Sequence, residues 1–170
     1  DEYGKGYLSG IIDISTTMYS SHALKEDGTI WSWGSNSDGQ LGVNASTDSS
    51  THGIPRKTII DNVAKINSGA YSILALKEDG TVWSWGAGAS AQMGDGARTQ
   101  RSLPVQAKNV TDVKKVATGC YITLVLKNDG TVWAWGLNRY GQLGIGVSST
   151  SSSNANYVRT TAVQVKLNST

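Results

Sequence analysis

The sequence predicts an all-β fold: a propeller-like array of four-stranded antiparallel blades, built by three repeats of about 50 residues and not closed by one chain. First, a motif occurs three times, as ALKEDGTIWSWGSNSDGQLG at 23–42, ALKEDGTVWSWGAGASAQMG at 75–94 and VLKNDGTVWAWGLNRYGQLG at 125–144. Second, apolar residues beside the motif tend to alternate, as in a strand. Third, no segment has a helical period. Four-stranded sheets repeated at this spacing are typical of propeller blades or a β-solenoid.

Each repeat contains four strand-like segments. We expect the first strands within 10–16, 62–69 and 112–119, the second within 19–25, 71–77 and 121–127, the third within 30–34, 82–86 and 132–136, and the fourth within 54–59, 103–108 and 161–166. Pro55 and Pro104 cannot donate a ladder hydrogen bond, which suits an edge strand or a strand start.

An Asp-Gly turn joins the second and third strands of every repeat. Asp-Gly between two alternating apolar runs is a strong hairpin signal, because glycine accepts a positive φ without steric cost. The recurring acids Asp27, Asp79 and Asp129 are therefore interpreted as turn residues rather than as paired catalytic carboxylates.

Two tryptophans follow each turn, and they point to the same side because alternate residues of a strand share a face. We interpret the pairs as core between blades and as the faces of the end blades, with a carbohydrate or peptide platform as the alternative. The six residues are Trp31, Trp33, Trp83, Trp85, Trp133 and Trp135.

The motif A-L-K-x-D-G-T-V-W-x-W-G-x-N-x-x-G-Q-L-G resembles the regulator of chromosome condensation repeat family. The resemblance covers three tandem copies within 9–170, at about 9–60, 61–111 and 112–170, after an N-terminal extension at 1–8. It implies a β-propeller. It also implies a binding function, because the family includes a nucleotide-exchange factor for a nuclear GTPase, bacterial inhibitors of β-lactamase and bacterial surface proteins.

Charge and composition argue against several partner classes. The formal net charge is only +2 and the basic residues do not cluster, so we expect neither nucleic acid nor an anionic membrane as a partner. No apolar stretch is long enough to span a bilayer. The single cysteine, Cys120, lies in an apolar run, and we expect it to be a small buried core residue.

Motifs for catalysis, cofactors or metals are weak, and we expect a protein that is not an enzyme and holds neither cofactor nor metal. The segment GAGASA at 86–91 matches a dinucleotide loop, but no helix follows it. The segment NSDG at 36–39 lacks the remaining calcium ligands. His22 and His52 are not equivalent, and His22 occupies the slot of a leucine in the other repeats, so a general base there is disfavoured.

The variable linkers at 43–53, 95–102 and 145–161 fall at the same point of each repeat and should emerge on one rim. Loops on a rigid scaffold commonly carry recognition. Arginine and tyrosine are favoured interface types. The candidate contact residues of these loops and of the loop tips are Asn36, Asp38, Arg98, Arg101, Asn138, Arg139 and Tyr140.

Three blades cannot close a ring, and each end blade would leave an apolar face uncovered. A second copy placed after Thr170 would continue the repeat in phase. Three hypotheses follow. Copies assemble head to tail into a ring or filament, the chain is a fragment of a larger propeller, or a partner covers one end. We favour a structural module that assembles with copies of itself. The alternative is a binding module of enzyme-inhibitor or exchange-factor type.

The chain begins at Asp1 without an initiator methionine and contains N-x-S/T sequons at Asn44, Asn109 and Asn168. These features suit a processed or excised chain and give slight support to secretion. We therefore expect an extracellular or cell-surface location.

Overall fold

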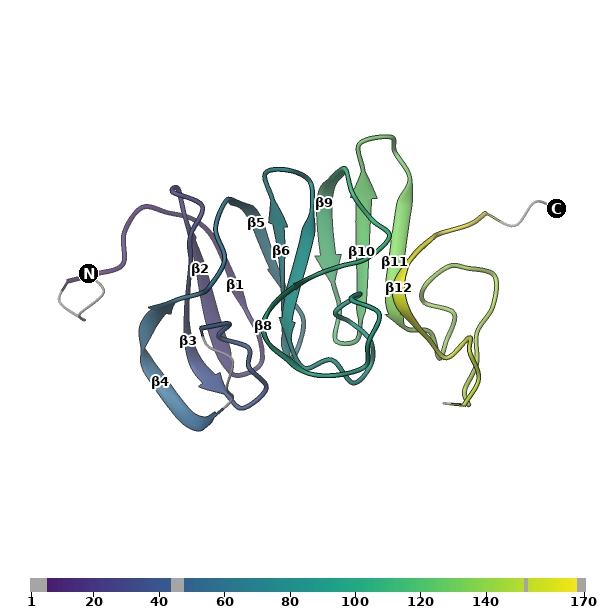
Figure 1. The fold of residues 1–170 in the computed structure, drawn as a ribbon, viewed down its shortest axis with the longest axis horizontal. Helices are drawn as coiled ribbons and strands as arrows, with labels where there is room; N and C mark the ends of the chain where they lie inside the picture. Colours follow the sequence, from purple (N-terminus) through teal and green to yellow (C-terminus); the bar gives the residue numbers. More distant parts are fainter. Residues whose placement is uncertain (1–5, 44–47, 152, 168–170) are drawn as a thin grey trace.

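Three four-stranded antiparallel sheets, one for each repeat, stand in chain order along the molecule (Figure 1). The computed structural model describes residues 6–43, 48–151 and 153–167. These residues form twelve strands and no helix. Strand order in every sheet follows the sequence, and the array is open. The predicted all-β fold of three unclosed four-stranded blades is confirmed.

The first sheet contains β1 (Ile11–Thr16), β2 (Ser20–Lys25), β3 (Ile30–Asn36) and β4 (Asp48–Lys57). The second sheet contains β5 (Val63–Ser68), β6 (Ser72–Lys77), β7 (Val82–Gly86) and β8 (Arg101–Gln106). The third sheet contains β9 (Val113–Thr118), β10 (Ile122–Lys127), β11 (Val132–Leu137) and β12 (Val158–Gln164).

The fourth strand lies at one edge of each sheet, where a proline costs no ladder hydrogen bond. Pro55 lies in β4 and Pro104 in β8, as their residue type predicts. β4 is longer than predicted: it begins at Asp48, and its residue Thr51 pairs with Ser35 of β3. Much of the predicted linker at 43–53 is therefore strand.

A glycine ends the W-x-W-G run of each third strand and turns the chain toward the following loop. Gly34, Gly86 and Gly136 have φ values of 107°, 104° and 104°. A Cβ on Gly86 would lie 2.4 Å from the Tyr71 carbonyl oxygen, so no other residue fits there. The next amide, of Ala87, donates to that same carbonyl at 3.0 Å.

The sheets pack face to face, with the first strand β5 lying between the first strands β1 and β9. Between the first and second sheets, Leu24 and Ile30 pack on a cluster that includes Ile66 and Trp85. Between the second and third sheets, Leu76 and Val82 pack in the same way, and the members from the third sheet include Val116, Val125 and Trp135. Each inter-sheet seam is thus a separate apolar core.

Among the described residues, no helix is long and apolar enough to cross a membrane.

Candidate binding surface

Two of the six tryptophans fill the seams between sheets. Trp85 and Trp135 are fully buried. The indole Nε1 of Trp85 donates to the Gln40 carbonyl of the preceding sheet at 3.0 Å, and that of Trp135 donates to the Gln92 carbonyl at 2.9 Å. These residues act as core, not as an open platform for a ligand.

Each buried indole lies against a glycine, whose lack of a side chain leaves room for the ring. A Cβ on Gly42 would lie 2.8 Å from Trp85 Nε1, and a Cβ on Gly94 would lie 2.7 Å from Trp135 Nε1. The final glycine of the segments GQLG at 39–42 and AQMG at 91–94 is therefore part of the seam.

The remaining tryptophans are only partly buried. Trp33 is the repeat equivalent of Trp85, but it lies on the open face of the first sheet, and its indole donates to none of the described residues. Trp83 and Trp133 donate to the hydroxyls of Thr81 and Thr131 at 3.0 Å. Trp31 Nε1 is a buried atom without a hydrogen-bond partner among the described residues.

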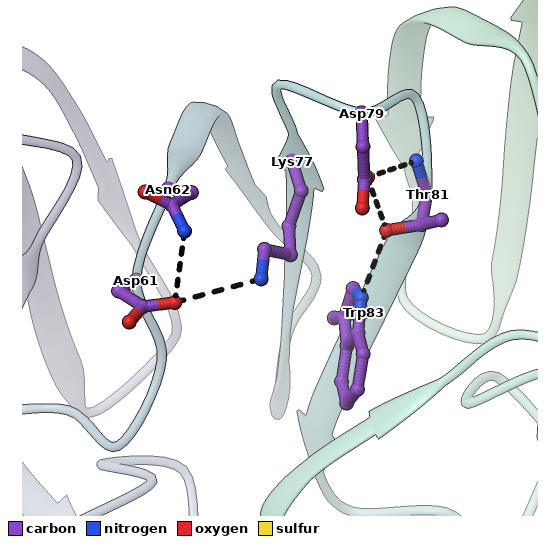
Figure 2. A network of polar contacts seen from close by, with 6 residues as sticks. All are labelled: Asp61, Asn62, Lys77, Asp79, Thr81 and Trp83. Carbon is purple, nitrogen blue, oxygen red and sulfur yellow. Dashed lines mark hydrogen bonds and ion pairs between the residues drawn. The ribbon is translucent and has the colours of Figure 1, made fainter.

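We call the edge formed by the turns between second and third strands, at 26–29, 78–81 and 128–131, the hairpin rim. In its middle turn, Asp79 Oδ1 accepts from the Thr81 amide at 2.9 Å and from the Thr81 hydroxyl at 2.6 Å (Figure 2). Lys77 lies over the Trp83 ring at 5.8 Å from its centroid, and its Nζ is 3.5 Å from Asp61 Oδ1.

Hydrogen bonds from threonine favour the ionised form of the turn acids. The Thr81 hydroxyl, and then the Thr81 amide, lower the pKa of Asp79 below its ordinary value. Thr29 and Thr131 lower the pKa of Asp27 and Asp129 in the same way. Each of these acids is an ionised carboxylate that accepts hydrogen bonds within its turn, which agrees with their interpretation as turn residues.

The substitution Thr81→Val is expected to lower the free energy of unfolding by about 1–2 kcal/mol, because the Thr81 hydroxyl bonds both Asp79 and Trp83. The matched control is Thr29→Val. The Thr29 hydroxyl bonds Asp27, but Trp31 does not donate to it. Urea unfolding midpoints should therefore shift more for Thr81→Val, and equal shifts would contradict the role of the Trp83 bond.

The opposite edge, which we call the loop rim, contains the turns between first and second strands and the loops that follow the third strands (Figure 1). The described parts of these loops are 37–43, 87–100, 138–151 and 153–157. The glutamines of the segments GQLG at 39–42, AQMG at 91–94 and GQLG at 141–144 shape these loops. The amides of Asp38, Ser90 and Tyr140 donate to the Oε1 atoms of Gln40, Gln92 and Gln142.

Two predicted contact residues hold the loops from inside. Asn36 and Asn138 are buried, and the Oδ1 atoms accept from the amides of Leu41 and Leu143 at 3.2 Å. The Asn138 Nδ2 also donates to the Val147 carbonyl at 2.7 Å. The loop wraps around each amide group and buries it, and the role of both residues as contacts stays a prediction.

The other predicted contacts are distributed as follows. Arg98, Arg139 and Tyr140 are exposed on the loop rim, and Asp38 is partly buried. Arg101 is the first residue of β8, and its Nε lies 2.7 Å from Asp95 Oδ2, so the Asp95 carboxylate neutralises its charge. The structure brings Arg139 and Tyr140 together, with the guanidinium carbon 5.3 Å from the ring centroid.

A row of aromatic side chains on the loop rim was not predicted. Tyr19, Tyr71 and Tyr121 precede β2, β6 and β10 at equivalent positions, and Tyr19 and Tyr121 are 62% and 44% exposed. The Tyr19 and Tyr71 rings are 6.5 Å apart, and the Tyr71 hydroxyl donates to the sulfur of exposed Met18 at 3.5 Å. The recurrence of tyrosine before each second strand is the signal that could have identified them.

The buried histidine is a structural group. His22 Nε2 lies 2.9 Å from the Ser20 hydroxyl, and Nδ1 lies 2.8 Å from the Ser32 hydroxyl, which contacts Thr58 at 2.9 Å. Burial lowers the pKa of His22 to about 3, so the ring is neutral. It occupies the place that buried Leu74 has in the second sheet.

The expectation that Cys120 is a buried core residue is wrong. It lies in the turn between β9 and β10, where the structure exposes it, because the apolar run around it is divided between two strands by this turn. The described residues contain no group of three or more His, Cys, Asp or Glu side chains that could hold a metal ion.

Comparison with known families settles the origin of the repeat. The sequence model described as "Regulator of chromosome condensation (RCC1) repeat" matches residues 27–76, 79–126 and 129–157, and a second model of this repeat matches 11–40, 63–92 and 113–142. The chain belongs to the RCC1 repeat family. The predicted resemblance is thereby confirmed, with three tandem repeats.

Curated RCC1-type relatives are much longer than this chain. The human E3 ubiquitin-protein ligase HERC2 is 35% identical over 96 residues, which cover 54% of this chain and 2% of HERC2. Protein pim1 of Schizosaccharomyces pombe is 33% identical, with 51% of this chain and 17% of pim1 covered. The ultraviolet-B receptor UVR8 of Arabidopsis thaliana is 33% identical, with 56% and 22% covered.

Solved RCC1-type structures share the fold. Prp20p of Saccharomyces cerevisiae superposes with a TM-score of 0.79 at 24% identity, covering 94% of this chain and 39% of Prp20p. Human WBSCR16 superposes with a TM-score of 0.74 at 23% identity, covering 92% and 38%. The three sheets are therefore arranged as in part of an RCC1 propeller, and the chain spans well under half of these proteins.

Proposed function

We propose that this chain is a segment of an RCC1-type propeller that binds a protein through its loop rim and has no catalytic role of its own. The observation that carries the proposal is the row of repeat-equivalent tyrosines, Tyr19, Tyr71 and Tyr121, on the rim that also presents Arg139 and Tyr140. Tyrosine and arginine are enriched among residues that dominate protein interfaces.

The RCC1 relatives support a protein partner as the class of ligand. The Prp20p structure is described together with binding to Gsp1p and histones, and a further structure contains Kap60 bound to yeast RCC1. For this chain, the exposed aromatic surface without a metal cluster in the described residues fits the same class of ligand.

The double substitution Tyr19→Ser with Tyr121→Ser is expected to weaken partner binding at least about tenfold, because exposed tyrosines are typical hot spots. The partner would first be captured by photo-crosslinking in the source cells, then purified and titrated by calorimetry. Circular dichroism would check that the variant is folded.

The matched control places the same two serines on the hairpin rim, as Glu26→Ser with Glu78→Ser, at exposed positions. It should bind like the unchanged chain. Undiminished affinity of the tyrosine variant, or an equal loss in the control, would overturn the assignment to the loop rim.

The self-assembling structural module favoured from the sequence stays a second candidate function, and copies would meet at the outer faces of the first and third sheets. Ile14 of β1 is 73% exposed, whereas its equivalent in β5, Ile66, is 5% exposed. Val132 of β11 is 38% exposed, whereas its equivalent in β3, Ile30, is fully buried. The extracellular or cell-surface location expected from the sequence stays a prediction.

A further inference from the structure

A shallow groove, which we call the rim groove, crosses the loop rim over the turns between first and second strands. It has a volume of about 360 Å³ and is lined by one triplet of residues from each sheet, 16–18, 68–70 and 118–120. The triplets lie at equivalent points of the three repeats, so the groove runs from sheet to sheet. Because the sheets stack through their faces, a further repeat at either end would lengthen this row of turns and would not cover the groove.

The floor of the rim groove offers hydrogen-bonding groups that few side chains obstruct. Gly69 and Gly119 have no side chain, and the Ser68 Oγ is a buried atom without a hydrogen-bond partner among the described residues. The Met18 amide donates to the Ala70 carbonyl at 2.9 Å, but the Ala70 amide, at the equivalent position, donates to none of the described residues. The polar backbone of a bound polypeptide would give these groups their partners.

The tyrosines beside the rim groove have the spacing of an extended chain. Tyr19, Tyr71 and Tyr121 directly follow the three triplets. The Tyr19 and Tyr71 rings are 6.5 Å apart. Alternate residues of an extended strand are about 6.7 Å apart and point to the same side. Two neighbouring tyrosines can therefore contact side chains that are two residues apart in one extended segment.

Two arginines give the same rim a positive charge at equivalent points of the second and third repeats. Arg139 lies three residues after Gly136, and Ala89 lies three residues after Gly86. Arg98 Nε donates to the Ala89 carbonyl at 3.2 Å, so its guanidinium is bound at the position that Arg139 occupies in the third repeat. Neither arginine has an acidic partner among the described residues.

The loops that hold these arginine positions start beside the tyrosines. The Ala87 amide donates to the Tyr71 carbonyl at 3.0 Å, and the Leu137 amide donates to the Tyr121 carbonyl at 2.9 Å. In each loop, the arginine position comes two residues after the residue that is bonded to the tyrosine. The positive charges therefore follow the row of tyrosines from the second sheet to the third.

Acidic side chains do not offset this charge. In the described loops of the rim, Asp38 is partly buried at the first sheet, and Asp95 pairs with Arg101. The triplets that line the groove contain no acidic residue. The rim beside the second and third sheets is thus positive, and a negatively charged ligand complements it.

We propose that the rim groove binds an extended segment of the partner protein, and that acidic side chains of this segment pair with Arg98 and Arg139. The backbone of the segment lies over the triplets and bonds to the Ala70 amide and the Ser68 hydroxyl. Alternate side chains contact the tyrosines, and the acids reach the arginines of the second and third sheets. This inference rests on the proposed function and adds the conformation and the charge of the bound segment.

The test pans the full chain against a phage-displayed library of random dodecapeptides. Enriched peptides should be rich in acidic residues and poor in basic ones. One enriched peptide, synthesised with a fluorophore, then serves as the probe in fluorescence anisotropy. Its affinity for the unchanged chain should fall as the salt concentration rises, because salt screens charge pairs at an exposed site.

The double substitution Arg98→Gln with Arg139→Gln should weaken binding of the probe at least about fivefold, the combined effect of two exposed ion pairs. The matched control is Lys65→Gln with Lys114→Gln, which removes two positive charges from exposed positions of β5 and β9. The control should bind the probe like the unchanged chain. Circular dichroism checks that both variants are folded.

The single cysteine allows the groove itself to be blocked. Cys120 is exposed and lines the groove, so a bulky maleimide attached to its sulfur should occupy the space of the segment. The labelled chain should lose most of its affinity for the probe. The variant Cys120→Ser, treated with the same reagent, should bind the probe like the unchanged chain.

The outcomes separate this inference from the proposed function. Absence of enriched peptides, equal affinity of the arginine and control variants, or full affinity after Cys120 is blocked would each overturn the acidic segment in the groove. The captured partner tests the proposed function through the variant Tyr19→Ser with Tyr121→Ser. If that variant loses the partner while the arginine variant binds it fully, the loop rim stands and the acidic segment is wrong.

Discussion

Replacing Trp85 with alanine is expected to lower the free energy of unfolding by about 3–5 kcal/mol, the range for truncation of a large buried aromatic side chain. The indole is fully buried between the first and second sheets and donates to the Gln40 carbonyl. Truncation therefore leaves both a cavity and a backbone carbonyl without its donor. Urea unfolding followed by far-ultraviolet circular dichroism measures the loss.

Trp33→Ala is the matched control, because Trp33 is the same residue type at the equivalent position of the first sheet. It is only partly buried, and the structure shows no hydrogen bond from its indole to the described residues. In a monomeric sample we expect its loss to be less than half of that for Trp85→Ala. Equal losses of unfolding free energy in the two variants would show that packing of Trp85 between the sheets adds no stability beyond its contacts within its own sheet.

Acidification is expected to destabilise the fold through His22. Burial lowers the folded-state pKa of His22 from 6.5 to about 3, so the unfolded chain takes up the proton first. The stabilisation is complete above pH 6.5 and falls by about 1.4 kcal/mol per pH unit as the pH decreases toward 3. At pH 4.5 the loss should reach about 3 kcal/mol. Unfolding free energies measured across this range test it.

His22→Leu separates this effect from other titrations. Leucine occupies the equivalent position in the second sheet, as Leu74, and is buried there. The variant should lose the pH dependence between 6.5 and 4.5. The turn acids Asp27, Asp79 and Asp129 contribute stability that is lost only as the pH falls below their ordinary pKa of 3.8. An unchanged slope in His22→Leu would assign the acid sensitivity to other groups.

Strands and hairpins could be predicted from the sequence because their signals are local. Alternation of apolar residues and the Asp-Gly turns place β2 and β3 and their equivalents within a residue or two of the prediction. The fourth strand of the first repeat was less predictable. β4 begins at Asp48, in a Ser- and Thr-rich segment without alternation, because pairing with β3 imposes the extended conformation.

The candidate site was less predictable because exposure depends on how a loop folds. Asn36 and Asn138 have the polarity of surface residues, but the loop closes over them through bonds to Leu41 and Leu143. Cys120 has apolar neighbours in sequence, but the chain reverses at that point and exposes it. A single sequence shows which residue types a loop contains. It does not show the turn geometry, which decides whether each side chain faces the protein or the solvent.

The order of strands within each sheet has a consequence for how the chain folds. Every strand pairs only with its neighbours in sequence, and each sheet packs on the next one along the chain. Contacts within a sheet therefore close comparatively short loops, at a small entropic cost, whereas contacts between sheets join residues 43 to 53 positions apart in the sequence. Folding can start at any of the three hairpins and spread to adjacent sheets, with each added repeat contributing its own stability and one interface.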